Sequence, residues 1–272
     1  MGRDQTPMEL ISHKEHAMKV LDSYISDMIS SCDPNVRSKA DKLSFWLEDY
    51  VKFLSFEPQF KSTSYKKYKR GDIIKVHLGY NIGSEEGGLH YAAVLENRNS
   101  IYSPTVTILP LTSVKPHIDT SNLGRGRVNI GNEIFTSLRA KIAAQKQSAR
   151  DELTELRLLI DASREIGDGI EEKIDIRIRE LNGIIGQIEK EQREIEKMKI
   201  GSIALINQIT TVSKIRIYDP KTNSGVLSGI RLSTITLDLI NNALADWMIY
   251  LATDDTSDST CLDSHNSNDN DA

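Results

Sequence analysis

Residues 132–199 contain two runs of apolar residues at alternating spacings of three and four, a pattern typical of helices that pack along their length. The first run consists of Ile134, Leu138, Ile142, Ala149, Leu153, Leu156 and Ile160. The second run consists of Ile170, Ile174, Ile178, Leu181, Ile185, Ile188 and Ile195. Gly167-Asp168-Gly169 separates the two runs. Two helices of roughly 30 residues, each about 45 Å long, are therefore expected to fold back as an antiparallel coiled-coil hairpin.

Strand-like sequence lies on both sides of this hairpin. Before it, three short apolar runs alternate with turns rich in Gly, Asn and Pro. These runs are residues 72–78, 91–96 and 105–111. After it, residues 202–209 and 215–218 have the same character. Short strands with tight turns favour a small β-barrel, and the sequence predicts its two parts at 69–131 and 201–252, separated by a hairpin insertion at 132–200.

Helices are also expected outside the strand-rich region. Residues 7–56 contain two helical stretches, and Asp33 can cap the second of them with Pro34 as its first helical residue. We expect residues 1–60 to form a helical extension that packs against the rest of the protein. A last helix is expected over residues 233–252. The predicted fold class is therefore α+β.

The composition bounds the location of the protein. No run of about 18 apolar residues occurs, which argues against a membrane span, and the N-terminus does not resemble a secretory signal. The two cysteines, Cys32 and Cys261, are far apart, so we expect no disulfide and a cytoplasmic location. Residues 253–272 hold six Asp and no Lys or Arg, and we expect a disordered acidic tail there. Without that tail the chain is nearly neutral, so net charge neither requires nor excludes a nucleic-acid ligand.

Four short motifs follow one another in the first strand-rich region. They are K-R-G-D at 69–72, G-S-E-E-G-G at 83–88, S-P-T at 103–105, and a strand that ends in Thr112. This ordered set resembles the PemK/MazF (also Kid) toxins of type II toxin–antitoxin systems. The resemblance continues after the insertion, where residues 201–217 look like the next strands of that family.

The resemblance implies an SH3-like barrel that dimerises and cleaves single-stranded RNA, such as mRNA, in the bacterial cytoplasm. It implies an endoribonuclease that needs no metal or other cofactor, and a separate antitoxin protein that fills the RNA groove. The family typically has Arg followed by Pro shortly after the Gly-rich motif, whereas this chain has His90 and Tyr91 there. The family residue that closes the third strand matches Thr112.

Metal-free RNA cleavage requires particular groups. The 2′-hydroxyl is the nucleophile, so the site needs a base, an acid and donors for the charge on the phosphate. His90 can exchange protons near neutral pH, and the N–H groups of Gly87 and Gly88 could face a phosphate. Thr112 could donate its hydroxyl to a phosphate oxygen, and Glu85 could orient His90 or a lysine. The catalytic hypothesis is therefore His90, Thr112 and Glu85, although His90 could instead be a packing residue and Glu85 a solvated loop carboxylate.

Basic residues near these motifs are candidates for contacts with RNA. Residues 65–70 interleave aromatic and basic side chains, as single-strand binders do, although a linker can have the same composition. Gly124-Arg125-Gly126-Arg127 has the sequence of a mobile basic turn near the base of the insertion. The expected RNA-binding set is Lys69, Arg70, Gly87, Gly88, Ser113, Arg125 and Arg127.

Alternatives from other functional classes stay open. The CcdB toxins use the same barrel, bind a protein target and catalyse nothing, and a non-toxic binding module whose hairpin recruits a partner is a further alternative. His13 and His16 lie three apart on a helix without accompanying ligands, so no metal site is expected. Motifs for nucleotide binding, zinc binding and α/β-hydrolase chemistry are missing from the sequence. The favoured function is an endoribonuclease toxin that pairs with an antitoxin, forms a homodimer and has no membrane partner.

Overall fold

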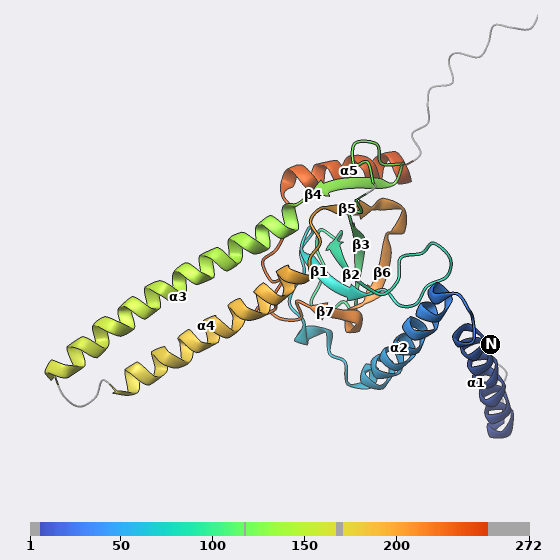
Figure 1. Cartoon of the computed structure of the whole chain (residues 1–272), viewed down its shortest axis with the longest axis horizontal. Coiled ribbons are helices and arrows are strands. Elements are labelled where there is room, and N and C mark those ends of the chain that lie inside the picture. Colours follow the sequence, from blue (N-terminus) through green and yellow to red (C-terminus); the bar gives the residue numbers. More distant parts are fainter. Residues whose placement is uncertain (1–5, 117, 167–170, 250–272) are drawn as a thin grey trace, which may run out of the picture.

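The computed structural model describes residues 6–116, 118–166 and 171–249 (Figure 1). The predicted turn at 167–169 and the predicted acidic tail with Cys261 lie outside the described residues. The helices are α1 (Pro7–Ile29), α2 (Pro34–Phe56), α3 (Glu133–Ile166), α4 (Glu171–Lys197) and α5 (Thr234–Met248). The strands are β1 (Ile73–His77), β2 (Leu89–Val94), β3 (Thr105–Ser113), β4 (Arg127–Gly131), β5 (Ser202–Leu205), β6 (Thr210–Ser213) and β7 (Ile217–Asp219). Short 3₁₀ helices occur at η1 (Glu57–Gln59), η2 (Ser62–Ser64), η3 (Ile206–Gln208) and η4 (Lys214–Arg216).

The strands form one antiparallel sheet in the order β4-β5-β3-β2-β1-β7, and β6 also pairs with β3. The strands that follow the hairpin pair with those that precede it, since β5 joins β3 and β4 while β7 joins β1. The α+β class predicted from the sequence is confirmed, with the strands on both sides of the insertion in a single sheet. Closure of that sheet into an SH3-like barrel stays a prediction.

Two strand assignments need correction. The segment expected to be a basic turn contains the start of β4, which pairs with β5 from Arg127 to Gly131. The single strand expected at 202–209 ends at Leu205, where η3 redirects the chain before β6. Both differences arise from pairing between segments distant in sequence, because β4 and β6 are short and gain their hydrogen bonds from β5 and β3.

Alternation along the strands produces two buried apolar layers, because successive side chains point to opposite faces of a sheet. Ile74, Val76 and Ala92 face one layer, which Tyr65 and Tyr68 help to fill. The opposite layer joins strand residues to the base of the hairpin, to α5 and to the segment before α5. Its members include Ile73, Ala93, Leu109, Leu111, Ile134, Leu138, Leu227 and Ile240. The hairpin is therefore anchored in the main core and extends away from the sheet (Figure 1).

Helices α3 and α4 pack against each other along a seam that follows the predicted one in part, since Ile134, Leu138, Ile142, Ala149 and Leu156 of α3 are buried as expected. Leu153, Ile160, Ile178 and Ile185 were expected to be inside and are between 37% and 49% exposed. On α4 Leu181 and Ile188 are buried as predicted, together with Glu191, while Ile184 and the predicted Ile195 are half-buried against the same core. Some polar residues between the two helices form ion pairs. Glu152 on α3 pairs with Arg177 on α4, with 2.6 Å between the guanidinium and a carboxylate oxygen. Ile170 lies outside the described residues.

Two glutamates hold the C-terminal half of α4 in place. Glu191 is fully buried, and its Oε1 lies 2.8 Å from the ammonium group of Lys141 on α3. Glu194 accepts hydrogen bonds from Lys75 on β1 and from Tyr91 on β2. Burial raises the pKa of Glu194, but the bonds from Lys75 and Tyr91 outweigh that effect and hold the pKa below its ordinary value. These contacts tie the end of the hairpin to the sheet.

The N-terminal helices begin as the sequence predicts. Asp33 accepts a hydrogen bond from the N–H of Asn35 at 2.8 Å, and Pro34 is the first residue of α2. Helix α2 contacts the sheet region through Trp46, whose ring stacks on His77 with 4.6 Å between centroids. Arg216 lies over the same indole ring at 5.4 Å. None of the described helices is both long enough and apolar enough to cross a membrane.

Candidate functional site

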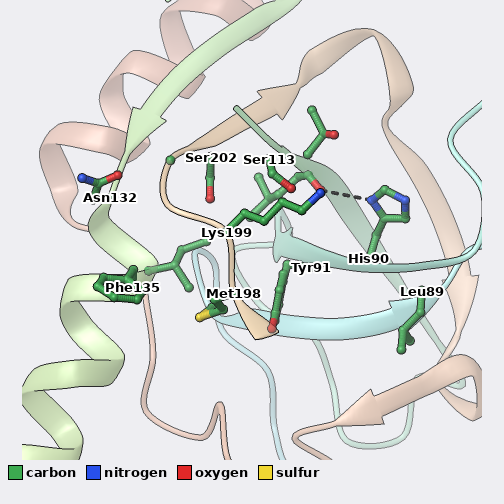
Figure 2. Close-up of a pocket in the computed structure, with 13 residues that line it drawn as sticks. Leu89, His90, Tyr91, Ser113, Asn132, Phe135, Met198, Lys199 and Ser202 are labelled. Atoms are coloured by element: carbon green, nitrogen blue, oxygen red, sulfur yellow. Dashed lines mark hydrogen bonds between the residues drawn. The ribbon is translucent and has the colours of Figure 1, made fainter. Parts of the chain in front are cut away.

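A hollow of about 160 Å³ opens beside the start of β2 and the end of β3, where most of the predicted catalytic residues meet (Figure 2). The strands β2, β3 and β5, the start of α3 and the link between α4 and β5 contribute to its wall. It is lined by Leu89, His90, Tyr91, Leu111, Thr112, Ser113, Asn132, Ile134, Phe135, Met198, Lys199, Gly201 and Ser202. The hollow therefore combines residues from before and after the inserted hairpin.

His90 is held between two acceptors. Its Nδ1 lies 3.2 Å from the carbonyl oxygen of Leu111, and its Nε2 lies 3.4 Å from a carboxylate oxygen of Glu86. A carbonyl and a carboxylate only accept hydrogen bonds, so a doubly protonated ring donates to both. A neutral ring donates at one nitrogen and can accept a proton at the other. The Glu86 contact is the longer of the two, and both side chains are partly exposed.

Hydroxyl groups gather opposite this ring because β3 changes partner there. Leu111 pairs with both β2 and β5, and the residues after it pair with β5 alone. Ser113 lies opposite Ser202 in this ladder. With Thr112, these residues bring three hydroxyl donors to the wall of the hollow. The predicted association of His90 with Thr112 and Ser113 is thus present in the geometry, while the roles of these residues stay predictions.

Glu85 lies elsewhere. It lines a second, polar hollow of about 440 Å³ together with Asn81, Gln208 and Arg216. The carboxylate that faces His90 belongs to Glu86. The suggestion that Glu85 orients His90 is therefore corrected, because the loop directs the next side chain toward the imidazole ring.

The N–H groups of the Gly-rich loop are largely engaged within the protein. Glu85 donates to Ile82 at 3.3 Å, and Glu86 donates to the side chain of Gln208 at 3.3 Å. Gly88 donates to Gly79 at 2.6 Å, with a φ of +82° that favours glycine. Gly87 and Gly88 thus shape the loop, and the expected display of both glycine N–H groups to a phosphate is not what the geometry provides, since that of Gly88 is taken.

The basic residues expected to bind RNA are dispersed. The guanidinium of Arg70 donates to the carbonyl of Leu95 and to Asn241 on α5, which makes it a structural link. Lys69 is exposed, and its backbone N–H donates to Asp72 at 3.0 Å. Tyr65 and Tyr68 in the same stretch are buried in the core, so they cannot stack on bases.

Arg125 and Arg127 are exposed before and at the start of β4, and neither lines the hollow with His90.

Sequence reasoning missed Lys199, which follows α4 and lines the hollow. It was assigned to the end of the hairpin, where a lysine is ordinarily a solvated residue. The available signal was its distance of only three residues from Ser202, in a strand that could pair with the one ending at Thr112 and Ser113. Asn132, which precedes α3, and Phe135 in its first turn were missed because both were assigned to the start of the hairpin.

Together these observations define a small antiparallel-sheet protein with a donor-rich pocket at the end of one strand and a helical hairpin inserted between β4 and β5. The comparison with protein families agrees: residues 69–150 match the family described as PemK-like, MazF-like toxin of type II toxin-antitoxin system. The chain thus contains a PemK/MazF-like toxin domain, accompanied by a helical N-terminal region and the α3–α4 hairpin. The match ends within α3, so β5, β6, β7 and α5 lie beyond it. No curated protein matches the chain.

Proposed function

We propose that this protein is an endoribonuclease toxin that cleaves single-stranded RNA without a metal ion. The observation that carries the proposal is the meeting of His90 with three hydroxyl side chains in one hollow of a PemK/MazF-like domain. None of the lining residues in that described hollow is an Asp or Glu. A pocket of donors beside an imidazole suits a phosphodiester, which offers only acceptor oxygens.

His90 is the proton-transferring group of the proposed reaction. The 2′-oxygen of the RNA forms a bond to phosphorus, its proton passes to Nε2 of a neutral His90, and the bond from phosphorus to the 5′-oxygen breaks. The proton that His90 has gained, or one from water, then passes to that oxygen, which leaves a 2′,3′-cyclic phosphate and a 5′-hydroxyl. Glu86, whose carboxylate lies 3.4 Å from Nε2, stabilises the ring after it gains the proton. Its contact must open to admit the 2′-hydroxyl.

Thr112 and Ser113 have a different role in the same scheme. Their hydroxyls donate to the phosphoryl oxygens, where negative charge increases in the transition state. Because neutral donors are weaker than charged ones, loss of Thr112 costs less than loss of His90. Lys69, Arg125 and Arg127 remain proposed contacts with RNA outside the hollow.

The test is single-turnover cleavage of a long single-stranded RNA in excess EDTA. His90→Ala should cut about 100- to 10,000-fold more slowly than the unmodified protein. His90→Arg, which restores the residue typical of the family, should retain part of the activity, and Thr112→Ala should lose less. His16→Ala on exposed α1 is the matched control and should cut at the original rate.

Two results would contradict the proposal. If the folded His90→Ala variant cleaves RNA at the rate of the unmodified protein, this hollow is not the active site. If the unmodified protein leaves RNA intact, the enzymatic proposal is refuted. The remaining alternatives are then a CcdB-like toxin or a binding module that acts on a protein target. A cognate antitoxin, a homodimer and a cytoplasmic location belong to the same proposal, and the mass of the purified protein in solution tests the homodimer.

A further inference from the structure

Lys199 brings an ammonium group to the hollow from outside the matched domain. It lies two residues beyond the end of α4 and lines the hollow with His90 and Thr112. Figure 2 shows its side chain extending across the hollow toward His90. Lys199 is exposed, so a ligand can reach its ammonium group without any rearrangement of the protein.

The charge of Lys199 is available, in contrast with those of two lysines nearby. Lys75 pairs with Glu194, and Lys141 pairs with Glu191, so both are neutralised by α4. Among the residues whose side chains the structure describes, no carboxylate forms an ion pair with Lys199. A positive charge without a protein partner, in a pocket of hydroxyl donors, favours an anionic ligand.

The backbone around Lys199 restricts where this charge can lie. Met198 donates to the carbonyl of Ile195 at 3.0 Å, which closes a turn at the end of α4. Gly201, with a φ of +85°, accepts a hydrogen bond from Val114 at 3.1 Å and begins the pairing with β3. Lys199 is therefore held between a helix anchored on the sheet and a strand that belongs to it.

A phosphodiester needs this cation for a reason that follows from the chemistry of His90. The imidazole is charged in only one of its two states, so it contributes no positive charge while it is ready to accept a proton. Hydroxyl donors then remain, and they bind an anion less strongly than charged donors do. The ammonium group of Lys199 is a cation that takes no part in this proton transfer.

We propose that Lys199 binds a phosphate of single-stranded RNA in this hollow, and that the inserted hairpin thereby completes the RNA site. This inference rests on the proposed function because it takes RNA as the ligand. The bound phosphate lies between the Lys199 ammonium and the hydroxyls of Thr112 and Ser113. The hairpin delivers the cation through the short link between α4 and β5.

The test measures equilibrium binding rather than catalysis. A fluorescent single-stranded RNA with 2′-O-methyl groups cannot be cut, so its affinity can be followed by anisotropy at several salt concentrations. Lys199→Gln should weaken binding and reduce the slope of log affinity against log salt by about 0.7, the value for one lost phosphate contact. Lys199→Arg should preserve most of the affinity. Lys197→Gln removes the same charge two residues away, outside the hollow, and should change the slope little.

Each result separates this inference from the proposed enzyme. If Lys199→Gln and Lys197→Gln bind alike, with unchanged melting temperatures, the assignment of Lys199 is overturned even if the unmodified protein cleaves RNA. If the unmodified protein binds RNA through Lys199 but leaves cleavable RNA intact, the catalytic proposal fails and the binding site stands. Absence of RNA binding by the unmodified protein at every salt concentration overturns both.

Discussion

The buried Glu191–Lys141 pair predicts an asymmetric response to mutation. Glu191 has no solvent exposure, and its Oε1 receives hydrogen bonds from Gln187 at 2.9 Å and Gln145 at 3.2 Å besides the contact with Lys141. Its Oε2 has no hydrogen-bond partner within the described residues. The Lys141 side chain differs, since it is 22% exposed and also donates to the carbonyl of Val226 at 2.8 Å.

The two single substitutions should therefore differ in cost. Lys141→Met leaves a carboxylate without its cation at a position that water does not reach, and loss of one partner from a buried pair costs about 3–5 kcal/mol. Glu191→Met leaves a lysine that still reaches solvent and keeps Val226, so the cost should be nearer 1–2 kcal/mol. The double substitution removes both charges and fills the space with apolar atoms. Its free energy of unfolding should therefore be close to that of the unmodified protein and about 2 kcal/mol or more higher than that of Lys141→Met.

Urea unfolding followed by circular dichroism measures these differences, compared at constant denaturant slope. Glu189→Met is the control on the same helix, because Glu189 is 59% exposed and lies 3.9 Å from Arg193. That substitution should cost less than about 1 kcal/mol. The reasoning is refuted if Lys141→Met costs no more than Glu191→Met, or if the double variant is as unstable as Lys141→Met.

Two further predictions concern stability. Burial is the main reason why the pKa of His77 lies below 6.5, and its Nδ1 accepts a hydrogen bond from Gly79. The unfolded chain then binds a proton more readily, so the free energy of unfolding should fall as pH drops below about 6.5. His77→Phe should flatten that part of a melting-temperature profile, and an unchanged profile would contradict it. Gly201→Ala should destabilise by about 1–2 kcal/mol from its left-handed φ alone, and by more because the new Cβ would lie 2.8 Å from Val114; an unchanged melting temperature would contradict that prediction.

Local patterns were sufficient for the helices and for the longer strands. The Asp33-Pro34 start of α2 depends on side chains adjacent in sequence, and the structure has it as predicted. The hairpin was also predictable, because apolar residues at spacings of three and four must find a partner surface. Much of its apolar seam was predictable as well, but its polar members were not, since residues such as Glu191 and Gln145 are polar by type and become interior only when each meets a partner on the other helix.

The candidate site shows the same division. The motifs in sequence order directed attention to His90 and Thr112, because those residue types in that setting suit phosphate chemistry. Whether a loop carboxylate faces His90 depends on loop geometry, and this selected Glu86 over Glu85. The sequence predicted Arg70 to be an RNA contact. In the structure its guanidinium donates to Leu95 and Asn241, which are distant in sequence.

Three features could be predicted from the amino-acid sequence: the α+β class, the inserted helical hairpin and the resemblance of the first strand-rich region to a toxin family. These features depend on periodicity and on motif order, which are properties of neighbouring residues. Tertiary structure alone decided that β5 pairs with β3, and that pairing brings Lys199 beside His90 although 109 positions separate them in the chain. The physical reason is that backbone hydrogen bonds between strands carry little sequence information, so a contact across the sheet is specified by the packing of the whole core.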